Sequence, residues 1–392
     1  MDAVWCEVDV EALAANVATF RRLVGEDVLL APAVKGGAYG HGLLLAARAF
    51  LRGGADWLCV HQIEEVRALR QAGINAPIQL LGPVLLADLA EAVALDARLV
   101  VYNPETIDRL AALGQPARLH LKIETGNHRQ GLEHEAALAL AARIAKAPGL
   151  ALEGVSSHFA NIEDTTDHRY ARQQLARFEA TVEALRAAGH AVPIRHLSNS
   201  AAALLWPDRC FEMVRIGVAG YGLWPSKETR VAAALAGRGD IALQPALTWK
   251  TRIAQLKTVP EGAFIGYGCT YMTTHRTRLA ILPVGYYDGY DRGLSNLAHV
   301  LIRGRRAPVR GRICMNLTMV DVTDVPDAAL EDEVVLLGAQ GDEVIAAEQL
   351  GDWAGTINYE VVTRIGGHLP RVPVCGAAVS APADAVYRAP RR

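Results

Sequence analysis

Short apolar runs alternate with amphipathic stretches along roughly the first 235 residues of the chain. The amphipathic stretches, such as YARQQLARFEATVEALRAAG, repeat their apolar residues near a period of 3.6, which is typical of helices. Strand–helix units repeated over ~200–250 residues are typical of a (β/α)8 barrel. The apolar runs that we predict to be its eight strands are residues 29–34, 57–61, 78–82, 99–102, 119–124, 154–159, 194–198 and 213–217.

The pattern changes after residue 240. Segments such as RLAILPVGY and DEVVLLGAQ indicate strands separated by Gly, Pro and Asp, with little helix, as in an antiparallel β domain. We therefore predict an α/β chain with an N-terminal (β/α)8 TIM-like barrel at 9–238 and a mainly antiparallel β domain at 239–384. The alternating opening segment, residues 1–8, is predicted to join the β domain. A doubly wound parallel sheet is the alternative, although it usually has fewer units and a glycine fingerprint after its first strand.

Composition narrows the class of protein. The 392 residues are 51% hydrophobic and 21% charged, with a formal net charge of -2, so neither nucleic acid nor a membrane surface is an expected partner. No apolar run approaches the ~18 residues of a membrane span, and acidic residues stand where a signal peptide needs basic ones. Six cysteines without CxxC spacing favour reduced thiols over disulfides or a zinc site. We expect a cytoplasmic protein that holds no metal.

Lys35 is the first candidate for chemistry. Active sites of such barrels lie where strands end, and Lys35 follows the first predicted strand and precedes a glycine-rich turn. A desolvated lysine has a lowered pKa or forms an imine with a carbonyl, whereas a strand-end lysine that extends to solvent is the alternative. Applied to the other strands, the same rule selects His61, Lys122, Arg129, His158, Asn199, Ser200, Arg215 and Gly217.

Two segments suggest a phosphate site. NSAAAL (199–204) opens a helix with a hydroxyl residue, and RIGVAGYG (215–222) offers glycine amides near a strand end. Tyr39, four residues beyond Lys35, could add a phenol. Pyridoxal 5'-phosphate satisfies both requirements, because it has an aldehyde for the lysine and a phosphate for the amides.

The segment around Lys35, VKGGAYGHG, is similar to the lysine loop of the alanine racemases, which are barrel-type (fold-type III) pyridoxal-phosphate enzymes. The resemblance covers nearly the whole chain, across both predicted domains, and the blocks follow in the family's order. These blocks are KIETGNHRQG (122–131), SSHFAN (156–161), HLSNSAA (196–202), VRIGVAGYG (214–222), GYGCTY (266–271), PVGYYDG (283–289), GRICMN (311–316) and TINYE (356–360).

The resemblance implies a two-base racemisation. Lys35 would bind the cofactor as an imine and serve as the base on one face of the substrate α-carbon, and Tyr267 would serve the opposite face. His158 resembles the residue bonded to that tyrosine. Arg215 resembles the group that faces the pyridine nitrogen, and His196 would orient it.

The resemblance also implies binding roles. Lys122 matches a lysine that is carbamylated in many members and would hold Arg129, which meets the cofactor's phenolic oxygen and the substrate carboxylate. Met315 would present its backbone N–H to that carboxylate, and Tyr286 would narrow the entrance. The implied cofactor-binding residues are Lys35, Tyr39, Asn199, Ser200, Arg215, Gly217, Val218 and Tyr359.

By the same resemblance, we expect interconversion of L-alanine and D-alanine, supplying D-alanine for peptidoglycan. The expected assembly is a homodimer with active sites shared between subunits, and the expected substrate is a small amino acid. A racemase that also accepts serine or larger amino acids, and a decarboxylase of the same fold, are alternatives. A cofactor-binding barrel without catalytic activity is a third, although it would not need the second domain.

The chain departs from the family's usual pattern at four places. Gly36-Gly37 replaces a more common Ala-Asn pair, and Asn316 stands where many members have aspartate. Tyr287 replaces a small residue, and His128 lies beside Arg129 where a smaller or amide residue is frequent. These departures bear on substrate choice and on the lysine loop, not on the type of reaction.

Overall fold

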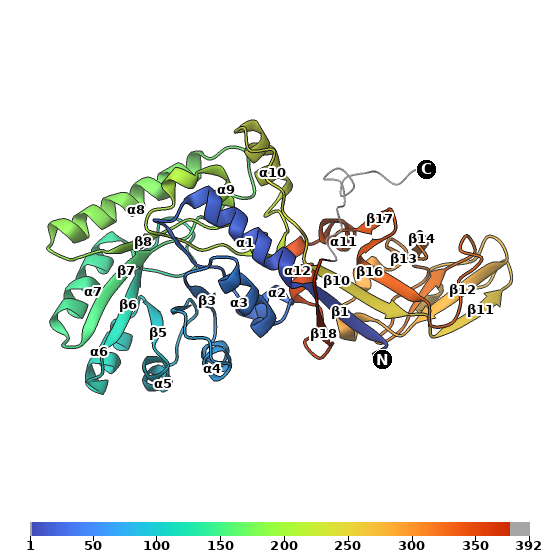
Figure 1. Ribbon diagram of the computed structural model, residues 1–392, viewed down its shortest axis with the longest axis horizontal. Helices are drawn as coiled ribbons and strands as arrows, with labels where there is room; N and C mark the ends of the chain where they lie inside the picture. Colours follow the sequence, from blue (N-terminus) through green and yellow to red (C-terminus); the bar gives the residue numbers. More distant parts are fainter. Residues whose placement is uncertain (1, 377–392) are drawn as a thin grey trace. The chain divides into compact units, whose positions relative to one another are not determined.

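The computed structural model describes residues 2–376, and the chain divides into two compact units, each drawn in Figure 1. The barrel unit contains residues 13–38 and 46–243. The β unit contains the described residues 2–12, 39–45 and 244–376. The last part of the predicted second domain, 377–384, lies outside the described residues.

The barrel unit is built on eight strands. Six of them form one parallel sheet in chain order, β3 to β8, and β2 pairs in parallel with β9. Backbone hydrogen bonds connect the two sets: Cys59 N–H donates to Pro32 (2.9 Å), and Arg215 N–H donates to Ser198 (3.1 Å). The strands are β2 (Leu29–Leu30), β3 (Leu58–Val60), β4 (Ile78–Leu80), β5 (Ala97–Val101), β6 (Ala117–Lys122), β7 (Leu150–Ser156), β8 (Ile194–His196) and β9 (Met213–Val214).

Helices lie outside these strands in Figure 1 and cover them with their apolar faces. In α8, for example, Leu175, Phe178, Val182 and Leu185 recur at helical spacing and are buried. The helices of this part of the chain are α1 (Val10–Val24), α2 (Lys35–Tyr39), α3 (Leu43–Arg52), α4 (Ile63–Gln71), α5 (Leu89–Ala94), α6 (Pro104–Leu113), α7 (His134–Lys146), α8 (Arg169–Ala187), α9 (Ser200–Leu205), η1 (Pro207–Arg209), η2 (Val218–Tyr221) and α10 (Lys227–Leu235).

The prediction of a TIM-like barrel followed by a mainly antiparallel β domain is confirmed. Some strands are shorter than predicted: the run 29–34 is a regular strand only at Leu29–Leu30. Pro32 has no N–H to donate, which interrupts a regular ladder. The chain nevertheless continues beside its neighbour, because Ala31 and Ala33 donate to Val214 and Ile216 at 2.9 and 2.8 Å.

The β unit contains two sheets. The larger has the order β14-β13-β16-β10-β1-β18 with β17 on β16, and the smaller has the order β11-β12-β15. The first strand of the chain, β1, pairs antiparallel with β10 and parallel with β18. The strands are β1 (Val4–Asp9), β10 (Leu247–Arg252), β11 (Gln255–Val259), β12 (Thr277–Leu282), β13 (His299–Ile302), β14 (Arg305–Pro308), β15 (Thr318–Asp321), β16 (Glu333–Gln340), β17 (Glu343–Ile345) and β18 (Arg371–Val374).

Two short helices, α11 (Ala347–Ala354) and α12 (Asn358–Thr363), also belong to this unit, together with the turns η3 (Tyr267–Cys269), η4 (Tyr286–Asp288) and η5 (Arg292–Leu294). Neither α11 nor α12 was predicted from the sequence. The signal for α11 was weak, because its buried positions, Ala347, Leu350 and Gly351, include only one large apolar side chain. Within residues 2–376, no helix has both the length and the apolar character needed to cross a bilayer.

Candidate active site

The loop after Lys35 forms a turn of left-handed helix. Gly36, Gly37 and Ala38 have φ values of 63°, 60° and 56° with ψ values of 46°, 35° and 55°. The Glu65 carboxylate at the start of α4 holds this turn by accepting from the N–H of Gly36 at 2.7 Å. Left-handed backbone costs most residues roughly 1–2 kcal/mol but costs glycine nothing. The Gly36-Gly37 pair therefore suits the conformation that the loop adopts.

Lys35 lies among cations. Burial lowers its pKa, and the charges of Arg129 and Arg215 lower it further, while Glu65 opposes the change. A lowered pKa increases the share of neutral amine, which can attack a carbonyl or accept a proton.

Lys122, the last residue of β6, lies in the same cationic group. Its pKa is lowered well below its ordinary value by burial, and then by Arg215 and Arg129. None of the ion pairs formed within residues 2–376 includes Lys35, Lys122, Arg129 or Arg215. Four basic side chains without a carboxylate partner among the described residues, two of them arginines, form a site that suits an anionic ligand.

His158 follows β7 and faces the same cations. Burial lowers the pKa of its imidazole well below the usual value, and Lys122, Arg215, Arg129 and Lys35 add to this effect. The ring is therefore neutral near pH 7. Its backbone is fixed, because its carbonyl accepts from the Gln174 side chain at 3.2 Å.

Arg215 follows β9 and is almost fully buried. Its guanidinium donates to the carbonyls of Ser157 (2.8 Å) and His196 (3.0 Å), and also to Nδ1 of His196. Burial lowers its pKa to about 10. It stays charged at neutral pH, and its orientation is set by three acceptors.

The predicted phosphate segments meet at the N-terminus of α9. Asn199 caps this helix by accepting from Ala202 N–H at 3.0 Å, and Ser200 Oγ accepts from Gly217 N–H at 2.8 Å. The Gly217 amide is thus already engaged. By contrast, the N–H groups of Ser200 and Val218 donate to no acceptor among the described residues.

The β unit brings two other predicted cofactor residues together. The rings of Tyr39 and Tyr359 are 6.3 Å apart at an interplanar angle of 50°. Their segments pack tightly at Gly40, where a Cβ would lie 2.0 Å from the carbonyl oxygen of Val362 in α12. Arg371 also donates to the Gly40 carbonyl at 3.0 Å. This packing places the residues that follow the lysine loop beside α12.

Tyr267, Tyr286 and Met315 lie on exposed loops of the β unit, with 72%, 44% and 54% of their surfaces accessible. The loops of Tyr286 and Met315 are joined, because Tyr286 N–H donates to Cys314 (3.1 Å) and Tyr287 N–H donates to Met315 (3.0 Å).

The loop of Tyr267 is held against the segment that leads to Met315. A Cβ on Gly311 would lie 2.4 Å from the carbonyl oxygen of Ile265, so the two backbones are in close contact. The predicted residues therefore fall into two sets, one on each unit, and each set is assembled locally.

His196 was predicted from the sequence, but the two residues that continue its hydrogen bonding into the barrel, His120 and Glu153, were not. His120 Nδ1 lies 2.7 Å from His196 Nε2, and His120 Nε2 lies 3.1 Å from Glu153 Oε2. One signal for His120 was present. It stands two residues before Lys122 in a strand, and such residues share a face.

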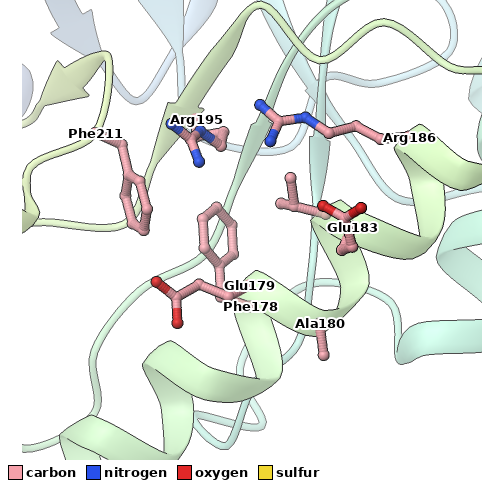
Figure 2. A pocket seen from close by; sticks show the side chains of 8 residues that line it. Phe178, Glu179, Ala180, Glu183, Arg186, Arg195 and Phe211 are labelled. Carbon is pink, nitrogen blue, oxygen red and sulfur yellow. The ribbon is translucent and has the colours of Figure 1, made fainter.

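A pocket of about 400 Å³ lies elsewhere on the barrel unit, between α8 and the segments that carry Arg195 and Phe211 (Figure 2). Glu179, Arg186, Arg195 and Phe211 are among its lining residues, and no predicted site residue is. Neighbouring strand residues point to opposite faces, so Arg195 reaches this pocket while His196 points inward. Among residues 2–376, no group of three or more His, Cys, Asp or Glu residues is arranged to hold a metal ion.

Comparison with known proteins gives one consistent family. Residues 8–225 match the model "Alanine racemase, N-terminal domain", and residues 246–373 match "Alanine racemase, C-terminal domain". The chain is 42% identical to the alanine racemase of Desulfosudis oleivorans, over 96% of this chain and 98% of that protein. It is 43% identical to that of Symbiobacterium thermophilum, over 95% and 97%. A solved alanine racemase from Bacillus anthracis with bound L-Ala-P has a TM-score of 0.90 at 35% identity, over 96% of each chain.

Proposed function

The chain belongs to the alanine racemase family and is an amino-acid racemase, and we propose that it interconverts L-alanine and D-alanine by a two-base mechanism. The observation that carries this proposal is the half-buried Lys35, whose pKa is lowered by burial and by neighbouring arginines that lack carboxylate partners among the described residues. In this proposal residues 9–238 bind the cofactor, and residues 239–384, with residues 1–8, supply the tyrosine base.

The cofactor of the family is pyridoxal 5'-phosphate. When bound, it supplies an aldehyde carbonyl and a conjugated ring that withdraws electrons from the substrate α-carbon. Its anionic groups match the cationic site. Lys35 would hold it covalently. The residues proposed to bind its phosphate are Tyr39, Asn199, Ser200, Gly217, Val218 and Tyr359, and the free N–H groups of Ser200 and Val218 support this role.

Racemisation needs one group that removes the α-proton and another that returns a proton from the opposite face. Lys35 is proposed for one face, because its environment favours the neutral amine. Tyr267 is proposed for the other face. A phenol has an unperturbed pKa near ~10 and needs assistance, which His158 would give as a neutral hydrogen-bond partner.

Arg215 is proposed to face the pyridine nitrogen of the cofactor. A guanidinium has only donors and stays protonated at neutral pH, so it would donate to that nitrogen without transferring a proton. His196 would orient it, and the contact between Arg215 and Nδ1 of His196 supports this role.

Arg129 is proposed to meet the substrate carboxylate and the cofactor's phenolic oxygen. Carbamylation of Lys122 would convert a cation into an anion that holds Arg129 in place. This modification needs a neutral amine, and the lowered pKa of Lys122 supports it. Met315 would donate its backbone N–H to the substrate carboxylate, and Tyr286 would narrow the entrance.

We also propose a homodimer in which Tyr267 completes the site of the partner subunit. The β unit exposes large apolar side chains around this residue, including Phe264, Met272 and Met315 at 60%, 51% and 54%. Exposed apolar surface of this kind marks an interaction site. The proposed setting is the cytoplasm, with D-alanine supplied for peptidoglycan.

The test is incubation of the enzyme and pyridoxal phosphate with L-alanine in deuterated water. The proposal expects D-alanine to appear together with α-deuterated alanine. Release of carbon dioxide would indicate the decarboxylase alternative, and unchanged substrate would reject both. A screen of the other amino acids under the same conditions measures whether serine or larger side chains are accepted.

A further inference from the structure

We propose that His120 and Glu153 are positioning residues that fix the orientation of Arg215 through a one-directional hydrogen-bond chain, Arg215–His196–His120–Glu153. The proposal rests on the role proposed above for Arg215 at the cofactor ring. It adds two residues whose hydrogen bonding determines how the guanidinium is held: His120, which is completely buried, and Glu153, which is partly buried.

The four groups form a continuous series of contacts through the barrel interior. Arg215 contacts Nδ1 of His196, His196 Nε2 lies 2.7 Å from His120 Nδ1, and His120 Nε2 lies 3.1 Å from Glu153 Oε2. Both imidazoles are completely buried. Burial also lowers the pKa of both rings, so that each is neutral at pH 7.

The direction of the chain follows from the chemistry of its two ends. The guanidinium can only donate, so Nδ1 of His196 must accept and the single proton of this neutral ring lies on Nε2. His196 therefore donates to Nδ1 of His120, and the proton of His120 in turn lies on Nε2. An ionised carboxylate can only accept, and Glu153 receives this last hydrogen bond. Each hydrogen-bond donor in this series therefore faces an acceptor.

The reverse direction is excluded by the arginine. If the proton of His196 lay on Nδ1, two N–H groups would face each other in a buried site, which is costly. The Gln79 amide nitrogen is 3.4 Å from His196 Nε2, a longer contact than the one to His120. Rotation of that amide would place its oxygen there as a second acceptor.

The barrel strands are shaped to admit His120. The pairing of β6 with β7 shifts register between Leu119 and His120, and such irregularities redirect a side chain. Opposite lies Gly154, where an added Cβ would be 2.5 Å from Nδ1 of His120. Only a glycine leaves room for the ring at this place.

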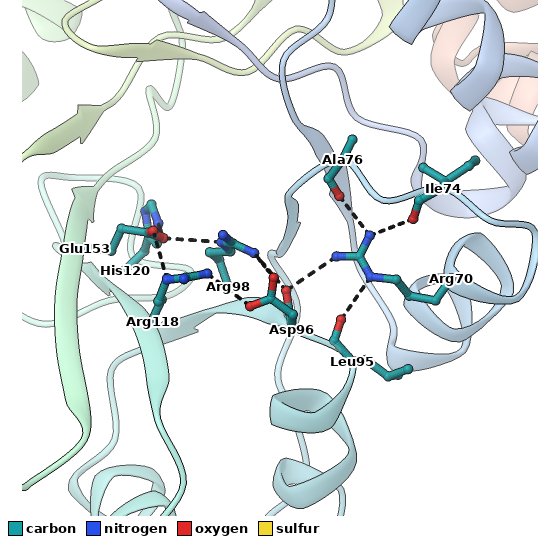
Figure 3. Close-up of polar contacts among 9 residues, drawn as sticks. All are labelled: Arg70, Ile74, Ala76, Leu95, Asp96, Arg98, Arg118, His120 and Glu153. Atoms are coloured by element: carbon teal, nitrogen blue, oxygen red, sulfur yellow. Dashed lines mark hydrogen bonds and ion pairs between the residues drawn. The ribbon is translucent and has the colours of Figure 1, made fainter.

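Glu153 lies beside two arginines (Figure 3). Its oxygens are 3.6 Å from Nε of Arg98 and 3.8 Å from Nε of Arg118. Both arginines also pair with Asp96, at 2.7 and 3.1 Å. This network fixes the accepting end of the chain at the side of the barrel where the strands begin.

The test compares variants that break the chain with one that preserves its direction. His120→Leu removes both a donor and an acceptor, and Glu153→Met removes the final acceptor. In His120→Gln the new side chain still accepts through its oxygen and donates through its nitrogen. Glu212→Met is the matched control, because Glu212 is also a carboxylate bound to an arginine, Arg195, at the side of the barrel where strands begin. Within the described residues, the side-chain hydrogen bonds of Glu212 are with Arg195 and include none of the four residues of the hydrogen-bond chain.

The first readout is ¹⁵N NMR of the histidine rings in the cofactor-free protein. We expect both His120 and His196 to carry the proton on Nε2 in the wild type. We expect the Nε2–H signal of His196 to shift in His120→Leu, and that of His120 to shift in Glu153→Met, because each variant removes the acceptor of that N–H. The second readout is racemisation by the loaded enzyme. We expect kcat to fall about 10-fold in both variants with little change in KM, as for other residues that orient catalytic groups, and His120→Gln to recover most of it.

A proton on Nδ1 of either ring in the wild type would overturn the proposal. So would wild-type kcat in both disrupting variants, or an equal loss in Glu212→Met. The first readout needs no substrate. A wild type that shows the expected tautomers but racemises no amino acid would therefore reject the proposed function and leave the hydrogen-bond chain intact.

Discussion

The two units prepare their parts of the proposed site in opposite ways. In the barrel unit, the ionisable side chains at and near Lys35 interact with one another, and burial lowers the pKa of each. These side chains are Lys35, Lys122, His158 and Arg215. In the β unit, Tyr267 lies on an exposed loop with 72% of its surface accessible. The electrostatics of the lysine side are therefore set within one unit, whereas the proposed tyrosine base lies exposed on the other.

The largest expected effect comes from a substitution in the barrel unit. Lys35→Ala removes both the proposed attachment point of the cofactor and one proposed base, so we expect racemase activity to fall by more than about 10⁴-fold. The cofactor's absorbance should no longer remain with the protein after gel filtration. Lys146→Ala, on the exposed end of α7, is the control. Retention of activity in Lys35→Ala would remove the lysine from the mechanism.

The corresponding change on the β side is Tyr267→Phe. It removes only a hydroxyl from an exposed ring, so the fold and cofactor binding should persist while kcat falls about 10²–10⁴-fold. Tyr271→Phe, in the same loop, controls for loss of a hydroxyl. Full turnover in both directions by Tyr267→Phe would refute the two-base assignment.

The lysine loop allows a comparison of the two units within a few residues. Gly37 belongs to the barrel unit and has open space around its Cβ position, whereas a Cβ on Gly40, in the β unit, would lie 2.0 Å from a carbonyl oxygen. Gly40→Ala should therefore lower the free energy of unfolding by about 4 kcal/mol, as other severe backbone clashes do. Gly37→Ala should lower it by about 1 kcal/mol, from its left-handed φ alone.

Denaturant unfolding of the two variants measures this difference. Equal losses in the free energy of unfolding would mean that the close contact at Gly40 does not contribute to the stability of the β unit.

The smallest effect concerns pH. Burial lowers the pKa of His158, so the folded state keeps this ring neutral while the unfolded chain takes up a proton below about pH 6.5. The unfolded state then binds more protons, and stability falls as the pH drops.

His158→Asn should therefore reduce the loss of stability between pH 7 and pH 5.5 by about 1 kcal/mol. Thermal and denaturant unfolding of the cofactor-free protein at the two pH values measures this change. His275→Asn, on the exposed surface of the β unit, is the control. An unchanged pH dependence in His158→Asn would show that the ring is protonated in the folded state as well.

Periodicity and turn residues predicted the barrel and the β domain, because both architectures repeat a local pattern many times. The position of Lys35 after a strand could also be inferred. The left-handed turn at Gly36-Gly37 could not, since glycine permits many conformations and only its contacts select one.

His120 and Glu153 were missed for a related reason. They lie inside strands, and the strand-end rule selects residues only where strands stop. Their importance depends on a register shift and on one glycine, Gly154, which are properties of paired strands rather than of a single segment.

The central claim is that Lys35 of one subunit and Tyr267 of another serve the same α-carbon. Its most direct test mixes Lys35→Ala and Tyr267→Phe, each nearly inactive alone, under conditions that exchange subunits. A mixed dimer would contain one site with both bases intact, so racemase activity should return to about a quarter of the wild-type value. Mixed dimers that form and show no activity above that of the separate variants would contradict the account.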